Sequence, residues 1–161
     1  MAGMQTLYEE YAQPLYKFLL SLSGNVDLAE DLLQETFYQA LLHIDRFEGK
    51  CNLYTWLCEI GKNAWLKECR RNKRYSDVSW DTLTVTAGGP SLETQAITRE
   101  EYRRASIAIQ NLEEPYRDVF ILHAIGGIKL KEIAFRFQKS ESWARVTYFR
   151  AKQQIIQEVS K

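Results

Sequence analysis

The C-terminal stretch, residues 113–159, constrains the fold most, because its apolar residues recur at helical spacing and turn signals interrupt them twice. Pro115 is placed in the first turn of one helix, and Gly126-Gly127 ends that helix. Ser140 is placed to cap the last helix, with a supporting helix before it. Three helices in this order are typical of a helix-turn-helix domain, whose final helix lies in the major groove of duplex DNA.

The rest of the chain shows the same spacing. Pro14 lies inside the first apolar pattern, so we expect a kink or a break near Gln13. Asn25 follows Ser23-Gly24 and is placed to start the second helix. The patterns predict an all-α fold. Apolar residues recur every three or four positions in four further stretches, residues 5–23, 26–45, 53–72 and 94–111.

Residues 73–97 break the periodicity. They are rich in Ser, Thr and Asp and contain Gly88-Gly89-Pro90. A stretch of roughly twenty residues without periodicity is long for a loop inside a compact domain, so it predicts a flexible linker between two small helical domains. The predicted limits are an N-terminal domain at 1–75, the linker at 76–95, and the helix-turn-helix domain at 96–161.

The formal net charge is zero, but the charges are segregated along the chain. Residues 1–48 and 76–97 are acidic, whereas residues 62–74 and 129–161 are basic. Two separate basic patches can each contact phosphates, and the acidic face is left for another partner.

Several classes of protein are not expected. The chain has no apolar run of about 18 residues and no signal peptide at its start, so we expect a cytoplasmic protein. The three cysteines form no CxxC pair, which predicts reduced thiols and no metal site. Without a P-loop or a supported His-carboxylate or Cys-His pair, we expect no enzyme, no cofactor and no small-molecule substrate.

The helix over 26–45 has one apolar and one polar face. Spacing alone favours a solvated polar face over a binding surface. The apolar face, predicted to point inward, contains Ala29, Leu32, Leu33, Thr36, Phe37, Ala40, Leu41 and Ile44. The polar side carries Asp31, Gln34, Glu35 and Tyr38.

Two further surfaces combine aromatic and basic residues. In the helix over 53–72, with Asn52 as its expected cap, Lys62, Asn63 and Lys67 are predicted to point outward. Its aromatics and cations suit single-stranded nucleic acid, and a core Trp with a solubilising helix end explains them equally well. The outward side of the last helix carries Ser142, Trp143, Val146, Phe149 and Arg150, flanked by Arg145 and Lys152.

Three stretches, in family order, resemble bacterial sigma factors of the extracytoplasmic-function (ECF) group. The first is Asp27-Leu-Ala-Glu-Asp-Leu-Leu-Gln-Glu-Thr-Phe37, which is similar to the family's "DAEDLVQETF" motif. The second is Tyr54-Thr-Trp-Leu-Cys-Glu-Ile-Gly-Lys-Asn63, preceded by Phe47-Glu-Gly and followed by Arg70-Arg71. The third comprises Leu112-Glu-Glu-Pro-Tyr-Arg-Asp-Val-Phe120, Lys131-Glu-Ile-Ala134 and Phe149-Arg-Ala-Lys152.

The resemblance implies a factor that binds core RNA polymerase, directs it to promoters and assists promoter melting. It implies polymerase contacts by Asp31, Gln34, Glu35 and Phe37. It implies single-stranded minus-10 contacts by Phe47, Lys50, Asn52, Tyr54, Trp56, Lys62, Asn63 and Lys67. It implies duplex minus-35 contacts by Lys139, Ser142, Trp143, Arg145, Val146, Phe149 and Arg150, with Arg145 the best suited to a guanine edge.

The resemblance also implies an anti-sigma factor, often membrane-bound in this group, which we expect to cover both DNA-binding faces. The chain departs from the family at Gln138, where a Gly is usual and a left-handed residue would be strained. Trp143, Val146 and Phe149 are more apolar than usual, which indicates an unusual minus-35 preference or a surface covered by a partner. The alternative is a helix-turn-helix regulator that acts without polymerase docking, and the Asp31–Phe37 motif argues against it.

Overall fold

The computed structural model describes residues 2–47, 49, 51–74 and 99–161. Every regular element in these ranges is helical, which confirms the predicted all-α class. The predicted linker at 76–95 lies outside the described residues. The N-terminal elements are α1 (Ala2–Ser23), α2 (Val26–His43), the 3₁₀ helix η1 (Ile44–Arg46) and α3 (Leu53–Arg74). The C-terminal elements are α5 (Arg99–Gln110), α6 (Tyr116–Phe120), the π-helix η3 (Ile121–Ile125), α7 (Leu130–Phe137) and α8 (Glu141–Val159).

The N-terminal unit is a bundle of α1, α2 and α3. Leu15, Leu19 and Leu57 are fully buried between the helices. A Cβ at position 61 would lie 3.0 Å from Leu19 Cδ2 and 3.2 Å from the hydroxyl of Thr36, so Gly61 lets α3 approach both neighbouring helices closely. Among the described residues, no helix is both long and apolar enough to cross a membrane.

The capping residues predicted from the sequence start their helices. The Asn25 side chain accepts a hydrogen bond from the Leu28 N–H at 3.0 Å, and Ser140 accepts one from the Trp143 N–H at 3.0 Å. Asn52 accepts from the Tyr54 N–H at 2.8 Å. These bonds satisfy donors that lack a partner in the first helical turn. Of the kink or break expected near Gln13, the break is excluded, because α1 continues through Pro14.

The C-terminal unit packs α8 across α5, α6 and α7. Val119, Ile121 and Ile133 form its buried centre, and Ala144 and Ala151 are the small residues of α8 that face it. In the helix-turn-helix, α7 ends at Phe137, and the next residue, Gln138, has a left-handed backbone with φ of 58° and ψ of 45°. A glutamine thus occupies a left-handed position at this turn, although the strain of that conformation predicted a reshaped turn.

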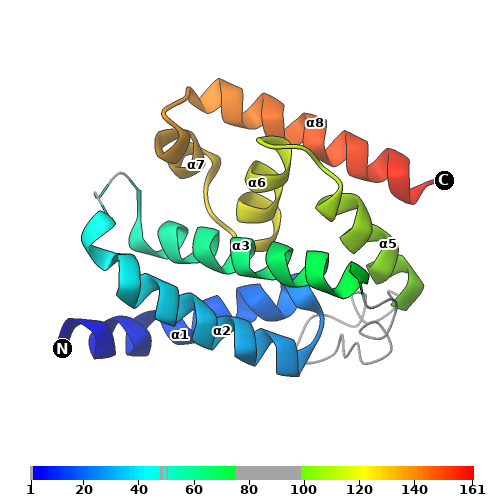
Figure 1. The fold of residues 1–161 in the computed structure, drawn as a ribbon. Helices are drawn as coiled ribbons and strands as arrows, with labels where there is room; N and C mark the ends of the chain where they lie inside the picture. Colours follow the sequence, from blue (N-terminus) through cyan, green and yellow to red (C-terminus); the bar gives the residue numbers. More distant parts are fainter. Residues whose placement is uncertain (1, 48, 50, 75–98) are drawn as a thin grey trace.

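The two units pack on each other, with α3 as the middle layer. Figure 1 shows α1 and α2 on one side of α3 and the C-terminal helices on the other. The hydroxyl of Tyr102 donates to the carbonyls of Ser21 and Leu22 at 2.8 and 3.1 Å, so it ties α5 to the end of α1. Burial raises the pKa of this tyrosine, so its hydroxyl stays protonated as a donor.

Candidate polymerase and nucleic-acid interfaces

The acidic motif of α2 is divided between surface and core. Asp31, Gln34 and Glu35 are exposed. Phe37 is 8% exposed, and its ring centroid lies 4.9 Å from that of Tyr8. The first three residues are therefore available to a partner, whereas Phe37 holds α2 against α1.

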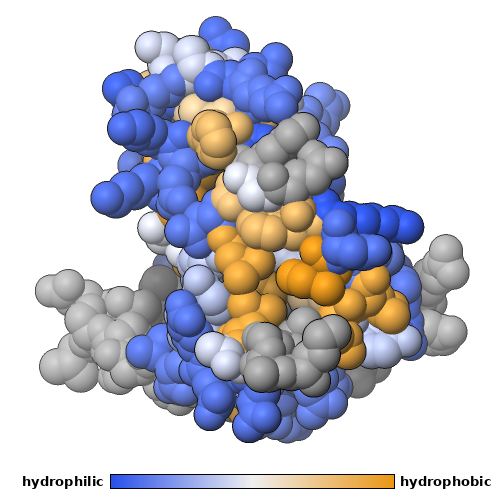
Figure 2. All heavy atoms as spheres, turned by 90° about the vertical axis from the view of Figure 1, so that its left-hand side faces the viewer, coloured by the Kyte–Doolittle hydropathy of each residue, from blue (hydrophilic) through white to orange (hydrophobic). Residues whose placement is uncertain are grey.

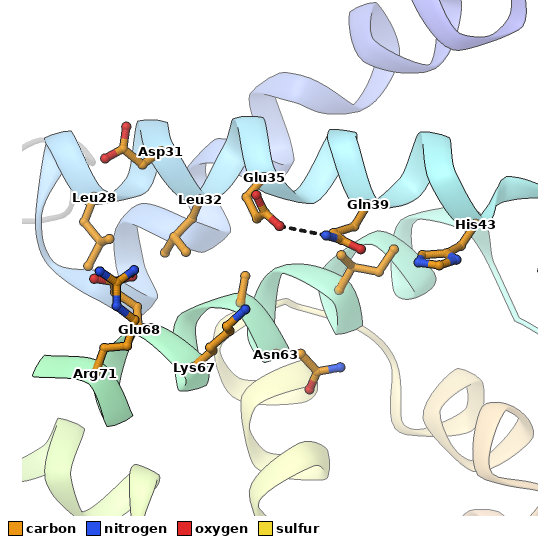
Figure 3. A pocket seen from close by; sticks show the side chains of 12 residues that line it. Leu28, Asp31, Leu32, Glu35, Gln39, His43, Asn63, Lys67, Glu68 and Arg71 are labelled. Atoms are coloured by element: carbon orange, nitrogen blue, oxygen red, sulfur yellow. Dashed lines mark hydrogen bonds and ion pairs between the residues drawn. The ribbon is translucent and has the colours of Figure 1, made fainter. Parts of the chain in front are cut away.

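A groove of about 800 Å³ runs between α2 and α3 beside this motif. Leu28 and Leu32 point from α2 toward α3, whereas Asp31 points away from it (Figure 3). Glu35 accepts a hydrogen bond from Gln39 at 2.8 Å. The remaining lining comes from His43 and from Ile60, Asn63, Ala64, Lys67, Glu68 and Arg71 of α3. The groove thus has the carboxylates of Asp31 and Glu35 on its α2 wall, and its α3 wall carries Lys67 beside the ion pair of Arg71 with Glu68.

The aromatic candidates for minus-10 recognition are already in contact with other parts of the chain. Phe47 and Trp56 are half-buried against each other, with ring centroids 5.2 Å apart. Tyr54 is stacked on Tyr11 at 6.3 Å, and its hydroxyl donates to the carbonyl of Gly126 at 3.5 Å. Burial raises the pKa of Tyr54, which keeps that donor protonated.

The polar minus-10 candidates differ in their exposure. Asn63 and Lys67 are exposed on the groove side of α3. Asn52 is exposed and caps α3. Lys50 lies outside the described residues.

The prediction that Lys62 points outward is wrong. Its residue is 2% exposed, and its Nζ lies 2.5 Å from Oδ1 of Asp118 on α6. The apolar spacing of α3 indicated one inner face, toward α1 and α2. The C-terminal unit covers a second side of the helix, which also buries Cys58.

A second ion pair crosses the same interface. The Arg136 guanidinium on α7 donates to both carboxylate oxygens of Glu59 on α3, at 2.7 and 3.0 Å. Burial raises the pKa of the Glu59 carboxyl, and the Arg136 guanidinium opposes this rise. Our sequence reasoning assigned no role to Glu59, Asp118 or Arg136, because an ion pair between distant helices leaves no periodic signal.

The minus-35 candidates lie around the start of α8, and most of them are open to solvent. Trp143 is half-buried against Phe137, with ring centroids 5.9 Å apart, and Lys139 Nζ lies 5.9 Å from its ring centroid. Arg145 is paired with Glu141 one turn earlier at 3.3 Å. The exposed candidates are Lys139, Ser142, Arg145, Val146, Phe149 and Arg150.

Apolar side chains also gather on the end of the molecule where α2 finishes. Figure 2 shows this face, with a band of hydrophobic surface that runs from the N-terminal unit toward the C-terminal one. Leu41, Leu42 and Ile44 are 48%, 52% and 37% exposed there. The predicted inward orientation of Leu41 and Ile44 is therefore wrong. A periodic pattern does not show which turns of a helix the other elements cover.

Comparisons with known proteins match both units. The family model "Sigma-70 region 2" matches residues 7–75, and "Sigma-70, region 4" matches residues 106–155. The ECF RNA polymerase sigma factor SigM of Bacillus subtilis (strain 168) is 29% identical over 149 residues, which cover 92% of this chain and 90% of SigM. The ECF sigma factor SigX of the same organism is 30% identical over 151 residues, covering 91% of this chain and 78% of SigX.

Solved structures share the fold. The sigma factor RpoE, in complex with the anti-sigma factor NepR from Bartonella quintana, superposes with a TM-score of 0.62 at 22% identity, covering 99% of this chain and 98% of that one. CnrH, in complex with the cytosolic domain of CnrY, gives a TM-score of 0.57 at 20% identity, covering 98% and 87%. With sigma regions 2 and 4 in order along one chain, this protein belongs to the ECF family of RNA polymerase sigma factors.

Proposed function

We propose that two domains, at 1–75 and 96–161, carry separate functions in this chain. The chain is a transcription initiation factor that directs RNA polymerase. The N-terminal domain binds core polymerase through Asp31, Gln34 and Glu35, and it binds minus-10 DNA through α3. The C-terminal domain binds the minus-35 duplex through α8. The groove between α2 and α3 carries this proposal, because exposed Asp31 and Glu35 on α2 and exposed Lys67 on α3 offer opposite charges to two different partners.

Polymerase docking is tested by retention of core polymerase on the immobilised factor. Gln34→Ala with Glu35→Ala removes exposed polar groups, so the fold is retained and we expect about tenfold less polymerase. Gln157→Ala with Glu158→Ala is the matched control, because it removes the same two group types from the exposed end of α8. Equal retention by both double variants would refute docking at α2.

The α3 surface is proposed to hold the single strand that melting releases. Extracting a base from the stack requires a few kcal/mol, and binding of the open strand supplies it without a hydrolysed fuel. Asn63 and Lys67 are the exposed polar candidates. Lys67→Ala should weaken binding to forked promoter DNA, whereas Lys161→Ala at the C-terminus should leave it unchanged.

An anti-sigma factor is proposed as the regulator, since the similar RpoE was solved in complex with the anti-sigma factor NepR. We propose that it covers both DNA-binding faces. Trp56 and Trp143 are half-buried in the chain alone, so fluorescence quenching can detect further protection of either ring. Unchanged quenching of both rings in the complex would contradict this arrangement.

A further inference from the structure

Two apolar side chains lie open on the proposed minus-35 surface of α8. Val146 is 47% exposed and Phe149 is 60% exposed. Residues three or four positions apart are neighbours on the surface of a helix, so these two side chains adjoin each other, and Arg145 adjoins Phe149. Single exposed apolar residues are common on soluble proteins, but a neighbouring pair within a proposed DNA-binding surface requires an explanation.

Trp143, the other large apolar residue at this end of α8, has a role in the fold itself. Its ring centroid lies 5.9 Å from that of Phe137 on α7, and the residue is half-buried. Contact between these two rings helps to hold α8 against α7 in the helix-turn-helix. Packing therefore accounts for Trp143, but it does not account for the exposed parts of Val146 and Phe149.

The charges around this apolar pair favour duplex DNA as the molecule that covers it. Residues 139–152 contain one acid, Glu141, and four exposed cations, Lys139, Arg145, Arg150 and Lys152. An apolar protein surface would desolvate these cations without pairing them, which is strongly disfavoured. DNA offers phosphates to the cations on both sides of the major groove, and base edges to the side chains between them.

The major groove contains an apolar group that such side chains can contact. It is the C5-methyl group of thymine, and apolar side chains such as Phe recognise it by direct contact. An α-helix rises about 1.5 Å per residue, so positions 146 and 149 are about 4.5 Å apart along α8. Adjacent base pairs are about 3.4 Å apart along the duplex. The two side chains can therefore contact the methyl groups of adjacent base pairs.

We propose that Val146 and Phe149 are specificity-determining residues, which contact the C5-methyl groups of thymines at two adjacent base pairs of the minus-35 element. The inference rests on the proposed binding of the minus-35 duplex by α8. It adds the chemical group that is recognised, a methyl group rather than a hydrogen-bonding edge. The base pair contacted by Arg145 lies next to these two, because Arg145 adjoins Phe149 on the helix surface.

Replacement of thymine by uracil tests the proposal, because uracil pairs with adenine in the same way and lacks only the methyl group. Duplexes with a random central segment of about one helical turn, roughly ten base pairs, are first enriched on the immobilised full chain. The duplex that binds most tightly is then synthesised with deoxyuridine in place of one thymine at a time. Fluorescence anisotropy should show about fourfold weaker binding at each of two adjacent positions, the value of one buried carbon, and no change at other thymines.

Protein variants assign each methyl group to a side chain. Val146→Ala and Phe149→Ala should each bind the thymine duplex more weakly and lose the difference between thymine and uracil at one of the two positions. Ile156→Ala is the matched control, because Ile156 is also 47% exposed on α8 but lies about 15 Å further along the helix axis. This control should keep wild-type affinity and the full difference between the two bases. The uracil substitution changes only the DNA, so no folding defect can imitate its effect.

Three results would overturn the proposal. Equal affinity of the wild-type chain for thymine and uracil at every position would show that no methyl group is recognised. A difference between the two bases that persists in both variants would assign its recognition to other residues. Unchanged duplex affinity in both variants would leave the apolar pair to a protein partner. In each of these cases the chain still binds a duplex, whereas enrichment of no duplex at all would refute the proposed minus-35 binding and this inference with it.

Discussion

The two surfaces that we propose to bind DNA differ in how far the folded chain exposes them. The minus-35 surface at the start of α8 is mostly exposed, and its Arg145 is held only by a surface pair to Glu141. The minus-10 surface of α3 has a buried lysine and aromatic rings in contact with other side chains. The proposed minus-35 surface is open in the folded chain, whereas part of the proposed minus-10 surface is in contact with other parts of the chain.

The largest expected effect concerns the buried pair. Lys62→Met leaves the Asp118 carboxylate buried without its partner, and we expect a loss of about 3 kcal/mol in the free energy of unfolding. Urea denaturation followed by circular dichroism measures it. Lys67→Met, on the exposed side of the same helix, should change stability by less than about 0.5 kcal/mol.

A double variant separates pairing from packing at this position. Lys62→Met with Asp118→Leu replaces both charges by apolar groups, and it should recover most of the stability lost in Lys62→Met, because no unpaired charge remains. If Lys62→Met and Lys67→Met lowered the free energy of unfolding equally little, the contrast between the buried and the exposed lysine would not hold.

The second prediction concerns base recognition by the proposed minus-35 surface. Arg145→Ala should cost about 1–3 kcal/mol of duplex affinity and relax specificity at one base pair, since an arginine discriminates guanine by two hydrogen bonds. Lys139→Ala should weaken binding to all sequences alike and reduce its salt dependence. Titration of minus-35 duplexes with single base changes measures both effects. Loss of affinity without relaxed specificity would assign Arg145 to the phosphate backbone.

The third prediction uses the apolar part of the same surface. Phe149 is 60% exposed, so Phe149→Ser should leave the unfolding free energy within about 0.5 kcal/mol of wild type. If the ring packs on DNA, duplex affinity should fall by about 1 kcal/mol, part of the value for burying a whole Phe side chain. Phe137→Ser is the contrast, because Phe137 packs against Trp143 and its loss should lower stability. Unchanged duplex affinity in Phe149→Ser would show that the ring does not pack on DNA and is available to a protein partner instead.

The same contrast explains how far the sequence predicts the structure. Asn25, Asn52 and Ser140 cap helices through bonds that span two or three residues, and local sequence specifies such bonds. The exposed candidates of α8 likewise follow from one helix and its period. The position of Lys62 depends on α6, far away in the chain, and periodicity within α3 contains no information about it.

Errors at the ends of helices have a related cause. Leu41 and Ile44 continue the apolar pattern of α2, yet they are 48% and 37% exposed. Exposed apolar residues grouped in this way often mark an interaction site. The residue pattern predicted the helix, and only the tertiary structure shows which of its turns are covered.

The smallest expected effect concerns the turn between α7 and α8, which orients the proposed minus-35 surface. Among the described residues other than glycine, Gln138 has a positive φ, 58°, and an L side chain is disfavoured there by about 1 kcal/mol or somewhat more. Gln138→Gly removes that strain but increases the entropy of the unfolded chain, so we expect a net gain of about 0.5 kcal/mol and a slightly higher Tm. Lys139→Gly relieves no backbone strain and only increases the entropy of the unfolded chain, so it should lower the Tm. Because the turn lies outside both ion pairs, Gln138→Gly should leave the radius of gyration and single-strand affinity unchanged. A change in either would mean that the helix-turn-helix is coupled to the interface between the two units, and the two proposed DNA-binding surfaces would then not be independent.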